Sequence, residues 1–178
     1  NSGYGRTKLA GEEEAMRQCP RTMIIRTAWL YSTFGNNFVK TMLKLGQERA
    51  ELRVVADQVG APTSAELIAD VTALAIAGYR QQHLTSGLYH LTAAGQVSWH
   101  GFAQFIFEEA AACGYTLMLD MTKLQAISTA DYPTPASRPA NSRMTCKTLE
   151  ERLKIQMPDW TAHVRRTVED LVKTHNKG

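Results

Sequence analysis

The sequence predicts an α/β protein built on a parallel sheet. Short apolar runs, rich in branched residues, alternate along the chain with longer segments whose apolar residues recur at helical spacing. Runs of this length suit strands buried on both faces, as in parallel sheets covered by helices. The apolar runs lie at 23–29, 52–55 and 87–91, and the helical segments lie at 5–18, 65–79 and 98–113.

The first predicted helix spans 5–18. Its residues after Lys8 are mostly good helix formers, and Pro20 ends it because the residue before a proline avoids the helical region. If Tyr4 is also helical, Tyr4 and Lys8 lie one turn apart on the same face. An ammonium beside a phenol favours the phenolate, so such a pair can exchange a proton with a carbonyl or an alcohol. A solvated Lys beside a half-buried Tyr would show the same spacing.

The apolar run at 23–29 is predicted to be a buried parallel strand. The carboxyl ends of such strands face the ligand crevice of an open α/β sheet. Thr27, Trp29 and Tyr31 are therefore expected near the chemistry. A core aromatic side chain is an equally good interpretation of Trp29.

A loop follows, and apolar residues at helical spacing then predict a helix over 37–45. Asn36 or Asn37 is the expected N-cap. The free backbone N–H groups at this helix N-terminus also suit a phosphate group. Further along, Ser64 is expected to cap the strongly apolar helix at 65–79.

Strands and helices continue to alternate in the second half. His90 lies in the strand at 87–91 and is expected to be a structural residue rather than a catalyst. The helix that begins at Ser98 ends before Gly114, which suits a C-cap glycine. Residues 117–121 are compatible with a short strand.

The segment 127–143 has no helical period and carries three prolines. It is predicted to be an ordered, functional loop, because a flexible tether would be richer in Gly and Ser. A short helix over 147–153 and a last helix that begins at Pro158-Asp159-Trp160 follow it.

The composition is that of an ordinary globular protein, with 44% hydrophobic and 21% charged residues among 178. The net charge of +3 is spread along the chain without a basic run, so neither nucleic acid nor a membrane is an expected partner. Cys19, Cys113 and Cys146 are too widely spaced for a metal motif or a disulfide framework. We therefore expect no metal site and a reducing, cytoplasmic setting.

Tyr-Gly-Arg-Thr-Lys-Leu-Ala-Gly-Glu, residues 4–12, resembles the active-site helix of the extended short-chain dehydrogenase/reductase family. Further segments match one branch of that family, which reduces dTDP-linked keto sugars, and they keep its order nearly to the C-terminus. These segments are Ile25–Tyr31, Gly35–Phe38, Asp57–Thr63, Gly87–Leu91, Asp131–Ala136 and Arg138–Arg143.

The resemblance implies reduction of the 4-keto group of dTDP-4-dehydro-L-rhamnose to dTDP-L-rhamnose by NADPH or NADH, a step of O-antigen biosynthesis. In that family the residue matching Tyr4 is the proton donor, and the residue matching Lys8 holds the nicotinamide ribose. The resemblance also places Tyr4 and Thr27 at the cofactor and Trp29 on the deoxysugar.

The resemblance further assigns Asn37, Arg138 and Asn141 to substrate binding. A planar guanidinium suits phosphate geometry, so Arg138 could pair with the diphosphate. A surface salt bridge is an equally good interpretation of Arg138.

The fold implied is the C-terminal part of a Rossmann-like, doubly wound parallel sheet plus a small mixed α/β substrate-binding lobe. Residues 1–60 would be the end of the dinucleotide-binding domain, 61–146 mainly the sugar-nucleotide lobe, and 147–178 the C-terminal helices. The family's Gly-rich phosphate loop, its reader of the adenosine ribose and the Ser or Thr that partners the Tyr are absent. The isolated chain is therefore expected to be inactive. Its strands at 23–28 and 52–55 should lose sheet partners and expose apolar edges.

Two other functions fit the same resemblance. An epimerase or dehydratase of the extended family acts on other nucleotide sugars with the same Tyr and Lys, although the segments from 131 to 143 favour the reductase branch. A regulatory subunit of methionine adenosyltransferase has the same fold and acts as a binding partner. A dTDP-sugar is the expected ligand, and a homodimer is possible.

Overall fold

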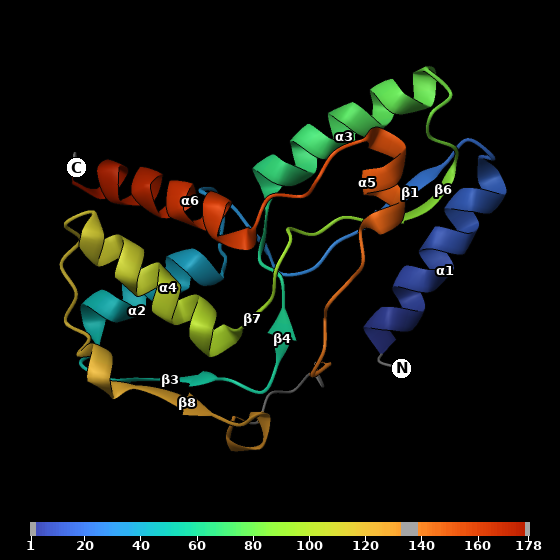
Figure 1. Ribbon diagram of the computed structural model, residues 1–178. Helices are drawn as coiled ribbons and strands as arrows, with labels where there is room; N and C mark the ends of the chain where they lie inside the picture. The colour runs from blue at the N-terminus through green and yellow to red at the C-terminus, as the bar shows by residue number, and fades with distance from the viewer. Residues whose placement is uncertain (1–2, 133–138, 177–178) are drawn as a thin grey trace.

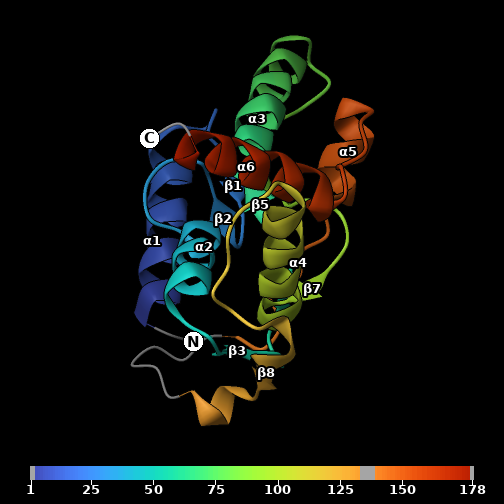
Figure 2. The ribbon, with the colours of Figure 1, turned by 90° about the vertical axis from the view of Figure 1, so that its left-hand side faces the viewer.

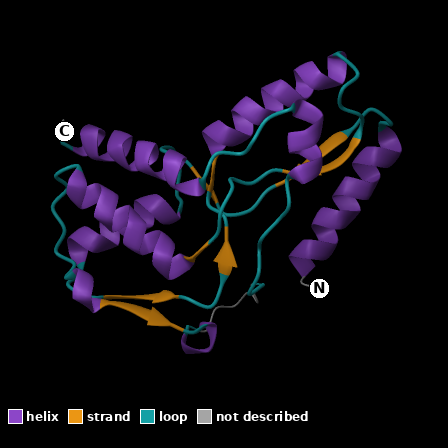
Figure 3. Cartoon of the chain, viewed as in Figure 1, coloured by secondary structure: helices purple, strands orange, loops and turns teal. Residues whose placement is uncertain are grey.

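The structure is a computed structural model that describes residues 3–132 and 139–176 (Figures 1 and 3). The helices are α1 (Gly3–Gln18), α2 (Phe38–Glu48), α3 (Ala65–Arg80), α4 (Trp99–Ala112), α5 (Lys147–Leu153) and α6 (Trp160–His175). The strands are β1 (Met23–Arg26), β2 (Leu30–Tyr31), β3 (Leu52–Val55), β4 (Val59–Gly60), β5 (Thr63–Ser64), β6 (Gly87–His90), β7 (Val97–Ser98) and β8 (Leu124–Ile127). The expected α/β fold class is confirmed.

Within the described ranges the strands form four two-stranded ribbons. Three ribbons are parallel and join β1 to β6, β2 to β5 and β3 to β8, whereas β4 and β7 are antiparallel. The parallel pairing follows from the helices that connect the strands, because a parallel neighbour requires a long crossover. β1 and β3 each have one hydrogen-bonded neighbour in the described part of the chain, and the opposite edge of each is unpaired there.

Two hydrophobic cores hold these elements (Figure 1). The first lies among α2, α4, α6, β3 and β8, and contains the fully buried Phe102 and Phe107. The second lies among β1, β6, α3 and α5, and contains Leu84 and Leu149. Figure 2 shows the same division, with α3 and α5 at one end of the molecule and β3 and β8 at the other. The domain boundaries expected at residues 60 and 146 stay a prediction, and both cores combine side chains from before residue 60, from 61–146 and from after 146.

The helix caps agree with the sequence. Asn37, Ser64 and Ser98 each accept a hydrogen bond from the backbone N–H three residues later, at α2, α3 and α4 respectively. Gly114 has φ +79°, the left-handed conformation that a helix C-cap glycine adopts.

The short strand expected at 117–121 is not formed. The N–H groups of Met118 and Leu119 instead donate to the carbonyl of Gly46, at 2.8 and 3.0 Å, near the end of α2. These two residues therefore satisfy one carbonyl near the C-terminus of α2 and do not pair with a neighbouring strand. The strand is β8, a few residues later, which pairs in parallel register with β3, from Leu52 opposite Leu124 to Val55 opposite Ile127.

The single strand expected over 23–29 is divided. β1 ends at Arg26 and pairs with β6, whereas β2 begins at Leu30 and pairs with β5. The three residues between them turn the chain from one ribbon to the next. This turn lies at the carboxyl end of β1, where the sequence predicts part of the site.

Candidate active site

Tyr4 and Lys8 share one face of α1, as their spacing predicts. The Lys8 Nζ lies 5.6 Å from the centroid of the Tyr4 ring, within the range of a cation–π contact. The hydroxyl of Thr7 donates to the carbonyl of Tyr4 at 2.9 Å and supports this first turn. The Tyr4 side chain is 73% exposed, so its hydroxyl is accessible to a ligand.

An ion pair ties α1 to the sheet. The Arg26 guanidinium at the end of β1 donates from both Nε, at 2.8 Å, and Nη2 to the carboxylate of Glu12. These hydrogen bonds lower the pKa of Glu12 and raise the pKa of Arg26. His90 lies opposite Arg26 on β6, and its expected structural role stays a prediction. The pair orients the helix that carries Tyr4 relative to the strand that leads to Trp29.

Sequence reasoning did not single out this ion pair. The available signal was a charged residue, Arg26, within an otherwise apolar strand, since such a residue is seldom buried without a partner. The partner was not evident, because Glu12 is one of three consecutive glutamates and only the packing of α1 selects it.

Thr27 and Trp29 occupy the turn between β1 and β2. Trp29 has φ +51°, a left-handed conformation that is rare for a bulky residue and that clusters at functional sites. Its carbonyl accepts from the N–H of Thr63 at 3.2 Å, which joins the turn to β5. The Thr27 hydroxyl is buried and has no hydrogen-bond partner among residues 3–132 and 139–176. A buried hydroxyl in this state is suited to a hydrogen bond with a bound group.

The Trp29 indole is half-buried and stacks on Trp99. The ring centroids are 3.6 Å apart and the ring planes differ by 13°. Gly60 lies against the same indole, and a Cβ at that position would be 2.5 Å from the Trp29 Cε2. Trp29 therefore packs on the first core through Trp99 while part of its surface stays open. The packing agrees with both interpretations of Trp29, a core aromatic and a sugar contact.

The carboxamide of Asn37 forms hydrogen bonds with the backbone of nearby residues. Its Oδ1 accepts from the N–H of Lys40 at 3.3 Å, and its Nδ2 donates to the carbonyl of Ser32 at 2.7 Å. These bonds cap α2 and close the loop before it. The assignment of Asn37 to the substrate stays a prediction. A contact with the substrate would use the carboxamide lone pair that these two hydrogen bonds leave free.

Asn141 lies beside β4, and Arg138 lies outside the described residues. The N–H of Val59 donates to the carbonyl of Ala140 at 2.9 Å, and the N–H of Ser142 donates to the carbonyl of Val59 at 2.8 Å. The Asn141 Oδ1 accepts from the N–H and the Nε of Arg143, both at 3.0 Å. The chain on either side of Asn141 is thus attached to the segment that contains Gly60 and contacts Trp29.

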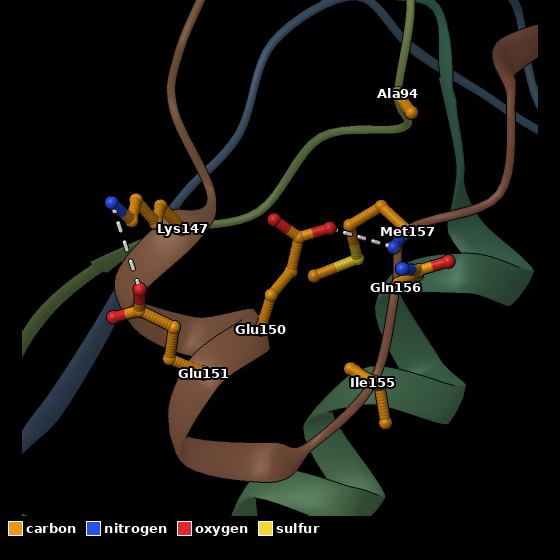
Figure 4. A pocket seen from close by; sticks show the side chains of 7 residues that line it. All are labelled: Ala94, Lys147, Glu150, Glu151, Ile155, Gln156 and Met157. Atoms are coloured by element: carbon orange, nitrogen blue, oxygen red, sulfur yellow. Dashed lines mark hydrogen bonds and ion pairs between the residues drawn. The ribbon is translucent and has the colours of Figure 1, made fainter.

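The hollows found on the described surface lie elsewhere. The larger, of about 470 Å³, is lined by α5 and the chain after it, where Glu150 accepts from the N–H of Met157 at 2.8 Å (Figure 4). A smaller neighbour of about 280 Å³ adjoins Cys146 and Thr92. Neither is lined by a residue predicted for the site.

The described residues contain no group of three or more His, Cys, Asp and Glu that could hold a metal ion. Within the same ranges no helix is long and apolar enough to cross a membrane.

A solved structure of low sequence identity shares this architecture. A UDP-glucose-4-epimerase from Stenotrophomonas maltophila, with bound NAD and formylated UDP-arabinopyranose, aligns with TM-score 0.67 over 99% of this chain and 56% of its own, at 15% identity. At that identity the likeness shows the fold alone. The class defined by fold and site is therefore an α/β protein of Rossmann-like architecture with a Tyr and Lys one helical turn apart.

The chain belongs to the RmlD substrate binding domain family, whose match covers residues 1–173. A dTDP-4-dehydrorhamnose reductase from Shigella flexneri is 47% identical over 171 residues, which are 96% of this chain and 56% of that protein. The chain thus spans little more than half the length of the curated relatives it matches.

Two solved dTDP-4-dehydrorhamnose reductases are also similar. The Clostridium acetobutylicum structure aligns with TM-score 0.79 at 34% identity, over 98% of this chain and 56% of its own. The Bacillus anthracis structure, in complex with NADP, aligns with TM-score 0.76 at 34% identity, over 94% and 55%. The family suggested by the sequence resemblance is confirmed.

Proposed function

We propose that this chain is the substrate-binding portion of an NAD(P)H-dependent reductase that converts dTDP-4-dehydro-L-rhamnose to dTDP-L-rhamnose. One arrangement carries the proposal. Tyr4 and Lys8 share a face of α1, and the Glu12–Arg26 pair ties that helix to β1, the strand that leads into the turn with Thr27 and Trp29. Proton donor and sugar contact therefore come from adjacent, connected elements.

When bound, a nicotinamide cofactor would provide the hydride for the keto carbon. The Tyr4 hydroxyl then donates its proton to the keto oxygen, which becomes the new alcohol. Lys8, one turn away, stabilises the phenolate that remains and holds the ribose. The unpartnered Thr27 hydroxyl fits a hydrogen bond to the cofactor.

The substrate would lie between Trp29 and the segments that contain Asn37 and Asn141. Trp29 offers an aromatic surface to the deoxysugar, which is largely apolar at its methyl group. Arg138 is assigned to the diphosphate, where a guanidinium could donate two parallel hydrogen bonds. These assignments are part of the proposal.

The test is a chimera, called here the complete enzyme, in which this chain replaces the corresponding C-terminal portion of the Shigella flexneri reductase. NADPH oxidation that depends on dTDP-4-dehydrorhamnose is expected. Interconversion of sugars without net NADPH oxidation would instead support an epimerase. A folded chimera that binds NADPH, reduces no keto sugar and binds methionine adenosyltransferase would support the regulatory-subunit alternative.

Trp29→Ala in the complete enzyme should raise KM for the dTDP-sugar roughly tenfold, the size of one lost aromatic contact of about 1.4 kcal/mol. Because the side chain is only half-buried, the loss of stability should stay below the ~3–5 kcal/mol typical of a fully buried Trp. Steady-state kinetics and thermal unfolding measure the two effects.

Trp160→Ala is the matched control. Trp160 packs edge-on against Phe102 and Phe105, with centroids at 5.9 and 5.0 Å. Its truncation should lower Tm and leave KM for the dTDP-sugar unchanged. If Trp29→Ala behaved in the same way, Trp29 would be a core residue and not a sugar contact.

A further inference from the structure

The Gln58 side chain lies between two groups that belong to distant parts of the chain. It is 7% exposed. Its Oε1 accepts from the indole Nε1 of Trp99 at 3.3 Å, and its Nε2 donates to the Oγ1 of Thr129 at 3.0 Å. The side chain therefore joins the first turn of α4 to the 3-10 turn at Thr129–Asp131.

The partners determine which way the amide points. The Thr129 hydroxyl donates its one hydrogen to Asp57 Oδ1 at 2.6 Å, so it can only accept from Gln58. The Trp99 Nε1 can only donate. A side chain at position 58 must therefore accept on one side and donate on the other. An apolar group of the same length leaves the half-buried Trp99 Nε1 without this acceptor, and a carboxylate cannot donate to Thr129.

The effect of Gln58 reaches Trp29 through Trp99. The Trp99 ring supports one face of the Trp29 indole, with centroids 3.6 Å apart. Two residues after Gln58, Gly60 contacts the same indole so closely that a Cβ would lie 2.5 Å from it. The segment 58–60 thus contacts Trp29 directly at one end and holds its stacking partner at the other.

We propose that Gln58 is a positioning residue for the reductase: it fixes the Trp99 indole, and Trp99 holds Trp29 in the orientation that contacts the sugar of the substrate. This inference rests on the proposed function of Trp29. A residue that acts only on stability would affect the binding of both substrates alike, whereas Gln58 should affect the sugar nucleotide selectively.

Gln58→Met in the complete enzyme keeps the length of the side chain and removes both hydrogen bonds. KM for the dTDP-sugar should rise roughly 3–10-fold, the usual effect of losing a buried hydrogen-bond partner, while KM for NADPH stays within about twofold, since the cofactor does not contact this network in the proposal. Equal rises in both KM values would overturn the selective role.

A double-mutant cycle tests whether Trp99 is the intermediary. Trp99→Phe keeps an aromatic ring for stacking but has no N–H that requires an acceptor. In that background Gln58→Met should raise KM for the sugar by less than about twofold, because the side chains at positions 58 and 99 are then both apolar and no N–H at position 99 is left without an acceptor. Additive effects of the two changes would show that Gln58 acts by another route. The double variant also covers the case in which Gln58→Met alone does not fold.

The 178-residue chain itself offers a readout that does not depend on activity. Two indoles stacked at 3.6 Å couple as excitons and give a paired circular-dichroism band in the far ultraviolet. Gln58→Met should weaken this band, Trp99→Phe should abolish it, and Trp160→Phe should leave it intact. An unchanged band in Gln58→Met would refute the positioning role. A weakened band with an unchanged sugar KM would instead refute the proposed sugar contact of Trp29.

Discussion

Tyr4→Phe in the complete enzyme should lower turnover by ~10²–10⁴-fold, the usual contribution of general acid catalysis, while substrate binding changes little. The substitution removes the proton donor and keeps the ring against which Lys8 lies, 5.6 Å from the centroid. Because the side chain is 73% exposed, stability should change by no more than about 0.5 kcal/mol. Single-turnover kinetics, with binding measured separately, isolate the chemical step.

Tyr79→Phe is the matched control for this experiment. Tyr79 lies in the last turn of α3, on a different element from Tyr4, and has no role in the proposed reaction. Its turnover should equal that of the unchanged protein. If Tyr4→Phe also stayed within a factor of a few of the unchanged protein, Tyr4 would not be the proton donor.

The 178-residue chain alone should not bind NADPH in the micromolar range and should not reduce the keto sugar. In this fold the pyrophosphate of the cofactor is held chiefly by a Gly-x-Gly-x-x-Gly loop and the helix N-terminus behind it. The 178 residues contain no such motif. Titration calorimetry of the chain with NADPH would contradict this expectation if it gave one-to-one binding near −8 kcal/mol, a micromolar dissociation constant.

The complete enzyme is the positive control and should bind NADPH in the same titration. The chain alone should also self-associate, because α1 has no buried residue and Leu9 is 47% exposed. The edge of β1 that has no partner among residues 3–132 and 139–176 adds a surface that can pair with another strand. Sedimentation at increasing concentration measures this association, and a monomer at all concentrations would show that these surfaces tolerate exposure.

The sequence by itself determined the features that depend on neighbouring residues. The spacing of Tyr4 and Lys8 implied a shared helix face because residues four apart meet on any α-helix. Ser64 was recognisable as a cap because a hydroxyl before an apolar helical segment satisfies its first N–H groups. The order of the segments from residue 4 to 143 was sufficient to identify the family, although the roles of all the predicted site residues stay predictions.

The tertiary structure alone decided the features that join distant residues. β3 and β8 pair across about seventy positions, and no local pattern distinguishes Leu124–Ile127 from the rejected strand at 117–121. The left-handed break at Trp29 arises because β1 pairs with β6 whereas β2 pairs with β5. Both partner strands lie much later in the sequence. The stack of Trp29 on Trp99 and the Gln58 hydrogen bonds to Trp99 and Thr129 likewise require four separate segments to meet. Local propensities are short-ranged, whereas the orientation of the site depends on packing between segments that only folding brings together.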